Sequence, residues 1–172
     1  MKHRTSYQML LIVVGMLVVF TGSVALQAEE EKSIVTQAWD AFNAKEYQEA
    51  IKLADQCIQD FGEEAANTQK AMEENKEPEP PVGKVDDATK QKIFERGLLN
   101  DVATAYFIKG RSAEKLYRQD KTQNAEYKKT AEEAYKTVCA SYKYGRTWDP
   151  KGWFWSPCTG GSESVNKKGE LR

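Results

Sequence analysis

A chain of 172 residues with a formal charge of −1 is long enough for one domain with a modest hydrophobic core. Its first 28 residues contain no acidic side chain, and the rest holds 26 acidic and 23 of the 25 basic side chains, a balance that gives no reason to expect nucleic-acid binding through phosphate neutralisation. The one histidine, His3, lies in that N-terminal segment, which excludes histidine-dependent nucleophilic catalysis, histidine zinc ligands and histidine general bases further along the chain.

The N-terminal segment has the layout of a secretory signal peptide. Lys2 and Arg4 precede an apolar stretch over residues 9–20, and small residues follow it. We therefore expect residues 1–28 to be a signal peptide with a cleavage sequence near residues 23–25. The alternative is an uncleaved N-terminal anchor, because the stretch is uncharged from residue 5 and long enough to span a bilayer. Both readings predict export to a bacterial periplasm, with membrane contact, or tethering to the inner membrane, only through this segment.

Three cysteines in an oxidising compartment predict one disulfide bond and one free thiol. A bond between Cys139 and Cys158 would hold the C-terminal segment against a helix. A bond between Cys57 and Cys139 would instead join two helices, and the sequence leaves both pairings open. We favour Cys57 as a small, buried apolar side chain.

Apolar residues recur at steps of three and four over residues 33–61, with a polar break at residues 43–46. This spacing predicts two amphipathic helices that fold back as an antiparallel hairpin. Residues 63–76 favour helix but offer little apolar surface, so we expect them to extend the second helix. The prolines that follow must end it, and they predict an exposed polar, proline-rich linker at about residues 76–86.

Two more helices are predicted after the linker. Asp86 and Asp87 offer an N-cap for a long third helix that continues to about Asp120. A fourth helix follows Thr122, and the apolar residues on its inner face are Tyr127, Ala131, Ala134, Tyr135 and Val138. No segment alternates between apolar and polar residues, so we expect no sheet. The predicted fold class is all-α, with one helical domain over residues 29–158.

The spacing of small and aromatic residues resembles the tetratricopeptide repeat (TPR), a helix-turn-helix unit of about 34 residues. The resemblance is carried by Ala38, Ala41 and Phe42, by KEYQEAIKLADQCI at residues 45–58, by VATAYFIKG at residues 102–110 and by AEEAYKTV at residues 131–138. It implies antiparallel helical hairpins stacked as a short right-handed superhelix. About ten additional residues, 111–121, separate the halves of the second unit, and a generic four-helix bundle is the alternative.

The segment over residues 142–158 is rich in aromatic side chains, among them Trp148, Trp153, Phe154 and Trp155. Residues 149–152 (DPKG) predict a turn. We expect the segment to act as an aromatic C-terminal cap on the last hairpin. The alternative is an exposed ligand platform. The polar, Gly/Ser-rich residues 159–172 predict a disordered tail.

The TPR resemblance implies a non-catalytic module for protein–protein interaction, a scaffold of the periplasm or cell envelope, with no cofactor, no metal and no catalytic residue. A peptide or helix of a partner protein would lie in a groove formed by the first helix of each hairpin. From helix phase, the groove residues would be Gln37, Asp40, Asn43, Asn100, Thr104 and Lys109. The alternative function is a glycan-binding accessory protein that uses the tryptophan-rich segment. Self-association through the face that lacks a third repeat also remains open.

Overall fold

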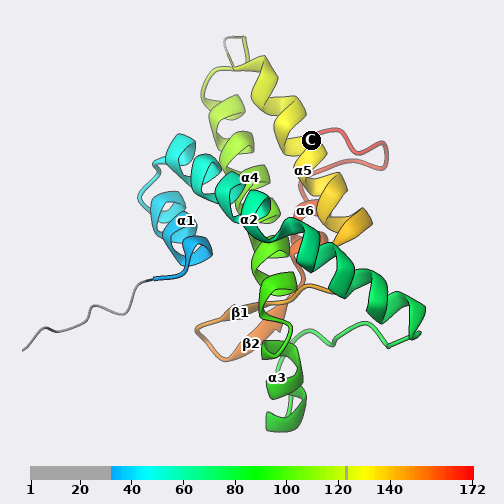
Figure 1. Cartoon of the computed structure of the whole chain (residues 1–172). Coiled ribbons are helices and arrows are strands. Elements are labelled where there is room, and N and C mark those ends of the chain that lie inside the picture. Colours follow the sequence, from blue (N-terminus) through cyan, green and yellow to red (C-terminus); the bar gives the residue numbers. More distant parts are fainter. Residues whose placement is uncertain (1–31, 123) are drawn as a thin grey trace, which may run out of the picture. The chain divides into compact units, whose positions relative to one another are not determined.

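The computed structural model describes residues 32–122 and 124–172 (Figure 1). The predicted signal peptide or anchor over residues 1–28 lies outside the described residues. Within them the chain is mostly helical, as expected, with six helices. The expectation of no sheet was wrong, because two three-residue strands form one small hairpin. None of the helices in the described ranges is long and apolar enough to span a bilayer.

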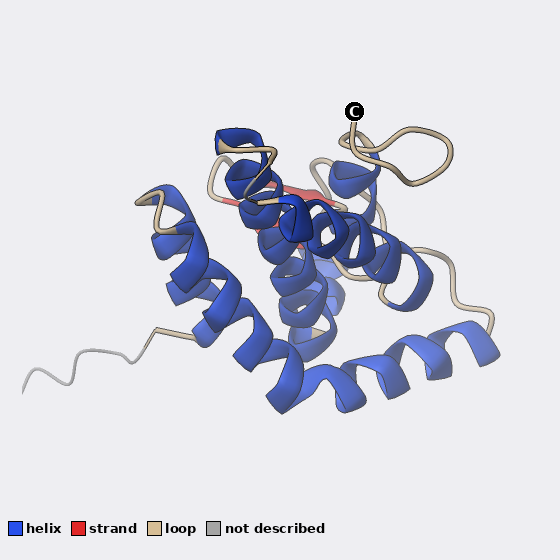
Figure 2. Cartoon of the chain, turned by 90° about the horizontal axis from the view of Figure 1, so that it is seen from above, coloured by secondary structure: helices blue, strands red, loops and turns tan. Residues whose placement is uncertain are grey.

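The first hairpin consists of α1 (Ile34–Asn43) and α2 (Tyr47–Glu74). The Ser33 hydroxyl caps α1 by accepting a hydrogen bond from the Thr36 amide at 3.3 Å. Lys45, with a φ of 66°, lies in the short turn that returns the chain. Seen from above, α1 lies beside the N-terminal half of α2 (Figure 2). The predicted polar extension is part of α2, which runs unbroken for 28 residues.

The third predicted helix is in fact two helices, α3 (Asp87–Phe94) and α4 (Gly97–Gln119). Asp86 caps α3, as the sequence predicted, by accepting a hydrogen bond from the Thr89 amide at 2.9 Å. At the break, the side-chain amide of Asn100 donates to the carbonyl of Ile93 at 2.6 Å. A side chain of α4 therefore takes the place of a helical hydrogen bond at the end of α3, which explains why the chain turns there.

Helix α4 lies at the centre of the described unit and packs against α2 and α5 (Ala125–Ser141), with smaller contacts to α1, α3 and α6 (Pro157–Ser162). The small residues that carry the TPR resemblance face this interior. They are fully or almost fully buried: Ala38, Ala41, Ala50, Ala54, Cys57, Ala103 and Ala131. Gly110 allows α5 to approach α4, because a Cβ atom there would lie 2.5 Å from the Tyr135 ring.

The hairpin is formed by β1 (Thr147–Asp149) and β2 (Trp153–Trp155), which pair antiparallel. The turn at residues 149–152 was predicted, and Gly152 has the positive φ, 96°, that a three-residue hairpin loop requires. Phe154 of β2 also exchanges two backbone hydrogen bonds with Gly83, at 2.7 and 2.9 Å. The proline-rich linker is therefore fastened to the hairpin at this point, although it contains no helix.

Buried Arg146 fixes the other part of the linker. Its guanidinium donates to the carbonyl of Pro80 at 2.8 Å and to the carboxylate of Glu79 at 2.8 Å. The same group also donates to the carbonyls of Lys143 and Gly145. One arginine thus joins the linker to the start of the aromatic segment.

The C-terminal residues 159–172, predicted to be disordered, are instead folded. They begin within α6, which Ser156 caps by accepting a hydrogen bond from the Thr159 amide. Val165 and Leu171 then form an isolated antiparallel bridge, and the Leu171 amide donates to Glu132 of α5 at 2.8 Å. The composition is polar, but the segment is held by this bond to α5 and by one of 3.0 Å from Arg118 of α4 to the Arg172 carbonyl, contacts that no local pattern reveals.

Candidate functional site

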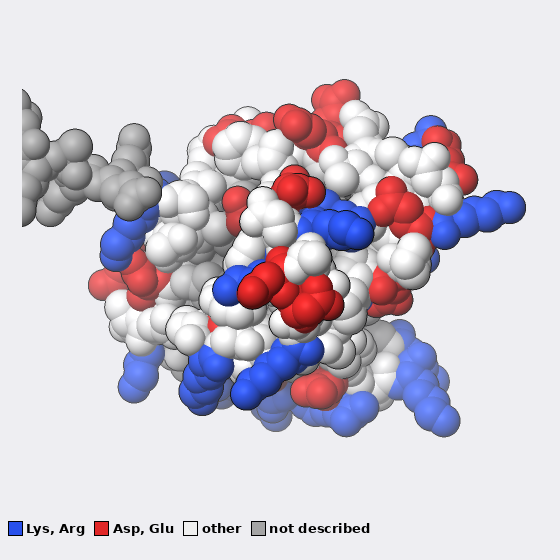
Figure 3. All heavy atoms as spheres, turned by 90° about the horizontal axis from the view of Figure 1, so that it is seen from below, with Lys and Arg blue, Asp and Glu red and all other residues white. Residues whose placement is uncertain are grey.

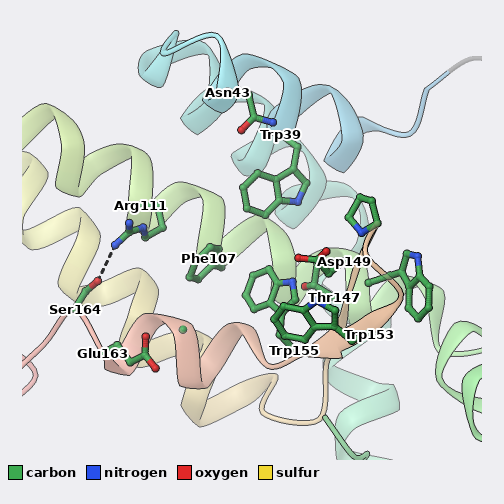
Figure 4. A pocket seen from close by; sticks show the side chains of 13 residues that line it. Trp39, Asn43, Phe107, Arg111, Thr147, Asp149, Trp153, Trp155, Glu163 and Ser164 are labelled. Carbon is green, nitrogen blue, oxygen red and sulfur yellow. Dashed lines mark hydrogen bonds between the residues drawn. The ribbon is translucent and has the colours of Figure 1, made fainter. Parts of the chain in front are cut away.

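The described residues enclose an open pocket of about 910 Å³ between α1, α4, the β-hairpin and the end of α6 (Figure 4). We call it the tryptophan pocket, because all four tryptophans of the chain line it. Its lining residues are Trp39, Asn43, Phe107, Arg111, Thr147, Trp148, Asp149, Pro150, Trp153, Trp155, Gly160, Glu163 and Ser164.

Three aromatic rings from three elements form the apolar wall of the tryptophan pocket. The Trp155 ring of β2 lies 4.7 Å from Phe107 of α4 and 6.4 Å from Trp39 of α1, between ring centroids. The planes of these two pairs are inclined at 67° and 70°. Edge-to-face contacts of this kind are favourable, and they leave the rings standing at steep angles to one another.

The hairpin divides its aromatic residues between two sides. Phe154 is fully buried and packs against Phe94 and Trp148 at centroid distances of 5.3 and 4.9 Å. Trp153, by contrast, is 36% exposed at the rim of the pocket. The amino group of Lys90 lies 4.3 Å from the centroid of the Trp148 ring. Of the four residues proposed as a cap or platform, Phe154 thus faces the interior, and the tryptophans line the pocket.

Two features hold the α6 wall in place. The disulfide bond joins Cys139 of α5 to Cys158 of α6, and Cys57 is the free cysteine. Gly160 lies against Phe107, because a Cβ atom there would come within 2.9 Å of its ring. This close approach brings Glu163 and Ser164, at the end of α6, to the edge of the tryptophan pocket.

Polar groups occupy the two ends of the pocket. Arg111, Ser164 and Glu163 lie at one end, Thr147 and Asp149 lie at the hairpin end, and Phe107 lies between them (Figure 4). The Arg111 guanidinium donates to the Ser164 hydroxyl at 3.0 Å and to Glu114 at 3.2 Å. At this end of the pocket a carboxylate and a hydroxyl therefore hold the Arg111 guanidinium in place.

Glu114 is a buried carboxylate behind the pocket. Besides the bond from Arg111, it accepts hydrogen bonds from the Tyr135 hydroxyl at 2.8 Å and from Arg118 at 2.9 Å. Burial acts to raise its pKa, but the hydrogen bonds from Tyr135 and Arg118 and the charge of Arg111 outweigh burial, so the pKa is lowered. Burial and the adjacent carboxylate raise the pKa of Tyr135. This carboxylate consequently keeps its charge and positions Arg111.

Asp149 and Glu163 are the two carboxylates on the pocket wall itself. One oxygen of Asp149 accepts a hydrogen bond from the Lys151 amide at 2.8 Å within the turn. Neither carboxylate forms an ion pair with any side chain in the described ranges 32–122 and 124–172. The pocket thus combines aromatic rings, two carboxylates and a paired guanidinium, groups that suit binding.

The predicted groove is wrong for two of its residues. Asn100 and Thr104 are only 8% and 4% exposed. The side-chain oxygen of Asn100 accepts a hydrogen bond from the Arg146 backbone amide at 2.9 Å, and the Thr104 and Thr147 hydroxyls share one of 2.6 Å. The helix phase was interpreted without the C-terminal hairpin, and that hairpin covers this face of α4.

The remaining predicted groove residues lie at the surface but do not form one site. Gln37 donates to the Lys32 carbonyl, and Asp40 pairs with the Lys32 amino group at 2.6 Å. Lys109 pairs with Asp55 of α2 at 2.6 Å. Only Asn43, at the end of α1, lines the tryptophan pocket.

Sequence reasoning missed Phe107, Arg111 and Glu163 as pocket residues. Phe107 directly follows Tyr106, and consecutive helical residues point about 100° apart, so the two aromatic side chains lie on different faces of the helix. Two adjacent aromatic residues in one helix, which cannot both face the same side, are the signal that could have identified it. Arg111 and Glu163 gave no such signal, because charged residues are frequent on exposed helix surfaces.

Free Cys57 does not add chemistry to the site. Burial is the main cause that raises its pKa to about 12, with further contributions from Asp101 and Asp60. The thiol therefore stays protonated at neutral pH. Within the described residues, no group of three or more cysteine, histidine, aspartate or glutamate side chains is placed to hold a metal ion.

Charge is mixed on the surface seen from below. Acidic and basic side chains both occur there, and basic ones gather along the lower edge (Figure 3).

Comparison of the chain with models of protein families, with curated proteins and with solved structures finds no match.

Proposed function

We propose that this protein is a non-catalytic binding module that takes part of a partner protein into the tryptophan pocket. One observation carries the proposal: four tryptophans, separated by up to 116 residues in sequence, line one open pocket. Tryptophan is the residue type most enriched at binding hot spots, and open apolar pockets with a few polar groups are typical ligand sites. Packing alone would favour burying these rings, yet Trp153 remains 36% exposed.

We further propose that the helices stack in a TPR-like superhelix. In this arrangement α1 and α2 form the first hairpin, and α4 and α5 form the second. The buried alanines and the packing of α4 against both α1 and α2 support it, since a first helix of a repeat contacts both helices of the preceding one. The β-hairpin would then cap the stack through Phe154, supplying apolar surface that a third repeat would otherwise provide.

The proposed location is the periplasm or cell envelope of a bacterium. It rests on the basic, apolar and small-residue order of residues 1–28 and on the disulfide bond, which persists in oxidising compartments. Contact with the membrane would be made by the N-terminal segment alone. Recognition would depend on the tryptophan pocket itself and not on a wide surface patch of one charge, because the face seen in Figure 3 carries both signs of charge.

Site-resolved photo-cross-linking in cells tests this proposal. The full-length chain carries a benzophenone amino acid in place of Trp153, and a matched chain carries it in place of Glu133, an exposed residue of α5 away from the pocket. We expect a discrete cross-linked protein from the Trp153 position and none from the Glu133 position. Equal cross-linking from both positions, or none from Trp153, would contradict a partner site at the pocket.

A glycan-binding accessory protein is the second candidate. The exposed Trp153 ring and the side chains of Asn43 and Asp149 around the pocket favour it, since sugars stack on indole faces and hydrogen-bond to amides and carboxylates. Envelope oligosaccharides should then quench the tryptophan fluorescence of the full chain. The quenching should disappear in Trp153→Ala while helicity is unchanged. Loss of helicity in that variant would instead assign Trp153 to the cap.

A further inference from the structure

We infer that the tryptophan pocket selects a cationic side chain, a lysine or arginine, of a partner polypeptide. The inference rests on the proposed function and names the chemistry that the same pocket recognises. Its two supports are the arrangement of the aromatic rings and the balance of charge on the pocket wall.

The aromatic wall offers rings of a kind that bind cations. Trp39 is inclined by 70° to Trp155 and by 49° to Phe107, so the three rings do not stack into a flat layer. All three rings line the pocket, and the face of an indole attracts an ammonium or guanidinium group. The chain uses this attraction itself next to the pocket, where the Lys90 amino group lies 4.3 Å from the Trp148 centroid.

The charge of the wall favours a positive occupant. The lining residues include two carboxylates and one basic side chain, Arg111, which pairs with Glu114 behind the pocket at 3.2 Å; Glu114 also pairs with Arg118. Asp149 and Glu163 then contribute two negative charges that no ion pair within the described residues balances. They lie at opposite ends of the pocket (Figure 4), so a cation held between the rings would meet a carboxylate in either direction.

Other occupants fit this wall less well. An apolar side chain would remove water from the two carboxylates without replacing its hydrogen bonds, which is unfavourable. A neutral sugar would hydrogen-bond to the carboxylates but would supply no counter-charge. An acidic side chain would be repelled by both of them. The stem of a lysine or arginine, in contrast, is apolar and packs against aromatic rings while its end carries the charge.

A titration of the full-length chain with short peptides tests the inference. The probe is the blocked peptide Gly-Lys-Lys-Gly, and the comparison peptides carry acetylated lysine or leucine in place of lysine. Binding is measured at 0.15 M salt from the NMR signals of the four indole N–H groups. We expect the lysine peptide to shift the signals of Trp39, Trp153 and Trp155, and both comparison peptides to bind at least about tenfold more weakly.

Charge-matched variants assign the effect to the pocket. Asp149→Asn with Glu163→Gln keeps the shape of both side chains and should weaken lysine-peptide binding at least about tenfold. Asp60→Asn with Glu133→Gln removes the same net charge from exposed positions of α2 and α5, and should change binding less than about twofold. Each single pocket variant repeats the test if the double variant loses its helical circular dichroism.

The alternative outcomes separate the two proposals. Equal binding of the leucine or acetyl-lysine peptide, or tighter binding of a neutral oligosaccharide, would overturn cation selectivity and leave the pocket as a binding site. Equal weakening by the two double variants would show general attraction to an acidic protein and would also overturn it. If no probe moves an indole signal and Trp153 yields no cross-link, the proposed function fails together with the inference.

Discussion

Ser112 of α4 places a hydroxyl oxygen in the interior without a hydrogen-bond partner among the described residues. An unsatisfied buried polar group opposes folding, and alanine has a higher helix propensity than serine. We expect Ser112→Ala to raise the free energy of unfolding by about 1 kcal/mol. Urea denaturation of the two proteins measures it, and a loss of stability in the variant would show that the hydroxyl has a partner.

Glu114 links stability to acid pH. Its pKa is lowered in the folded chain because its hydrogen bonds and ion pairs outweigh burial. A carboxylate with a lowered folded pKa contributes stability above its unfolded pKa of about 4.3, and this contribution is lost as the pH falls through the folded value. The free energy of unfolding should therefore fall from about pH 5 downward.

Glu114→Gln isolates this effect. The variant should be less stable at pH 7 by about 2 kcal/mol, because Arg111 and Arg118 lose their charged partner. Below pH 5 its stability should decline less steeply than that of the natural chain, since the titrating group is gone. Asp86, whose pKa is lowered by hydrogen bonds from Thr89, titrates in both proteins and serves as the common background. Parallel pH profiles would contradict the assignment.

Which residues carry the site was only partly predictable. The aromatic segment stood out by composition, and Trp148, Trp153 and Trp155 do line the pocket. Asn100 and Thr104 were misplaced, because helix phase shows which residues share a face but not what covers that face. Their hydrogen bonds go to Arg146 and Thr147, more than 40 residues away in sequence.

At the scale of elements, the sequence predicted what local chemistry decides. The turn before α2, the Asp86 cap and the turn at residues 149–152 follow from residue types at adjacent positions. The break before α4 and the folded C-terminus could not be predicted in this way. The break depends on a hydrogen bond from the Asn100 side chain of α4 to Ile93 of α3. The C-terminus depends on a hydrogen bond from Leu171 to Glu132 of α5, so each contact joins two different elements.

The docking of α6 depends on a glycine. A Cβ atom on Gly161 would lie 2.6 Å from the buried Tyr135 ring, so Gly161→Ala forces α6 away from α5. We expect a loss of about 1–3 kcal/mol in the free energy of unfolding. Gly97→Ala is the matched control, because no atom lies within 4 Å of that position, and it should cost nothing. Equal losses in thermal melts would indicate a backbone effect and not a packing effect.

The disulfide bond holds the same helix covalently. Replacement of both Cys139 and Cys158 by serine should lower the free energy of unfolding by about 2–4 kcal/mol, because the unfolded chain loses a constraint. Reducing agent should lower the melting temperature of the natural chain and leave that of the double variant unchanged. A reductant effect on the double variant would have to come from Cys57, whose burial argues against it.

At the scale of the described unit, the helical fold class could be predicted from the periodicity of apolar residues and the spacing of small ones. The pocket could not be predicted from either pattern. The pocket is assembled from α1, α4, the β-hairpin and the end of α6, and no local pattern indicates that these segments meet. Its central ring contact, Trp39 with Trp155, spans 116 residues of sequence. Long-range convergence of this kind is determined by packing, which a single sequence encodes only indirectly.

Hydroxyl-radical footprinting of the four tryptophans, read by mass spectrometry, tests the central claim most directly. The full-length chain is exposed to radicals in the cell envelope and again after purification away from every partner. We predict that Trp39, Trp153 and Trp155 are protected together in the envelope, while the exposed Lys129 and Lys136 of α5 react equally in both samples. Unchanged oxidation of these tryptophans, with protection on α5 instead, would contradict the account.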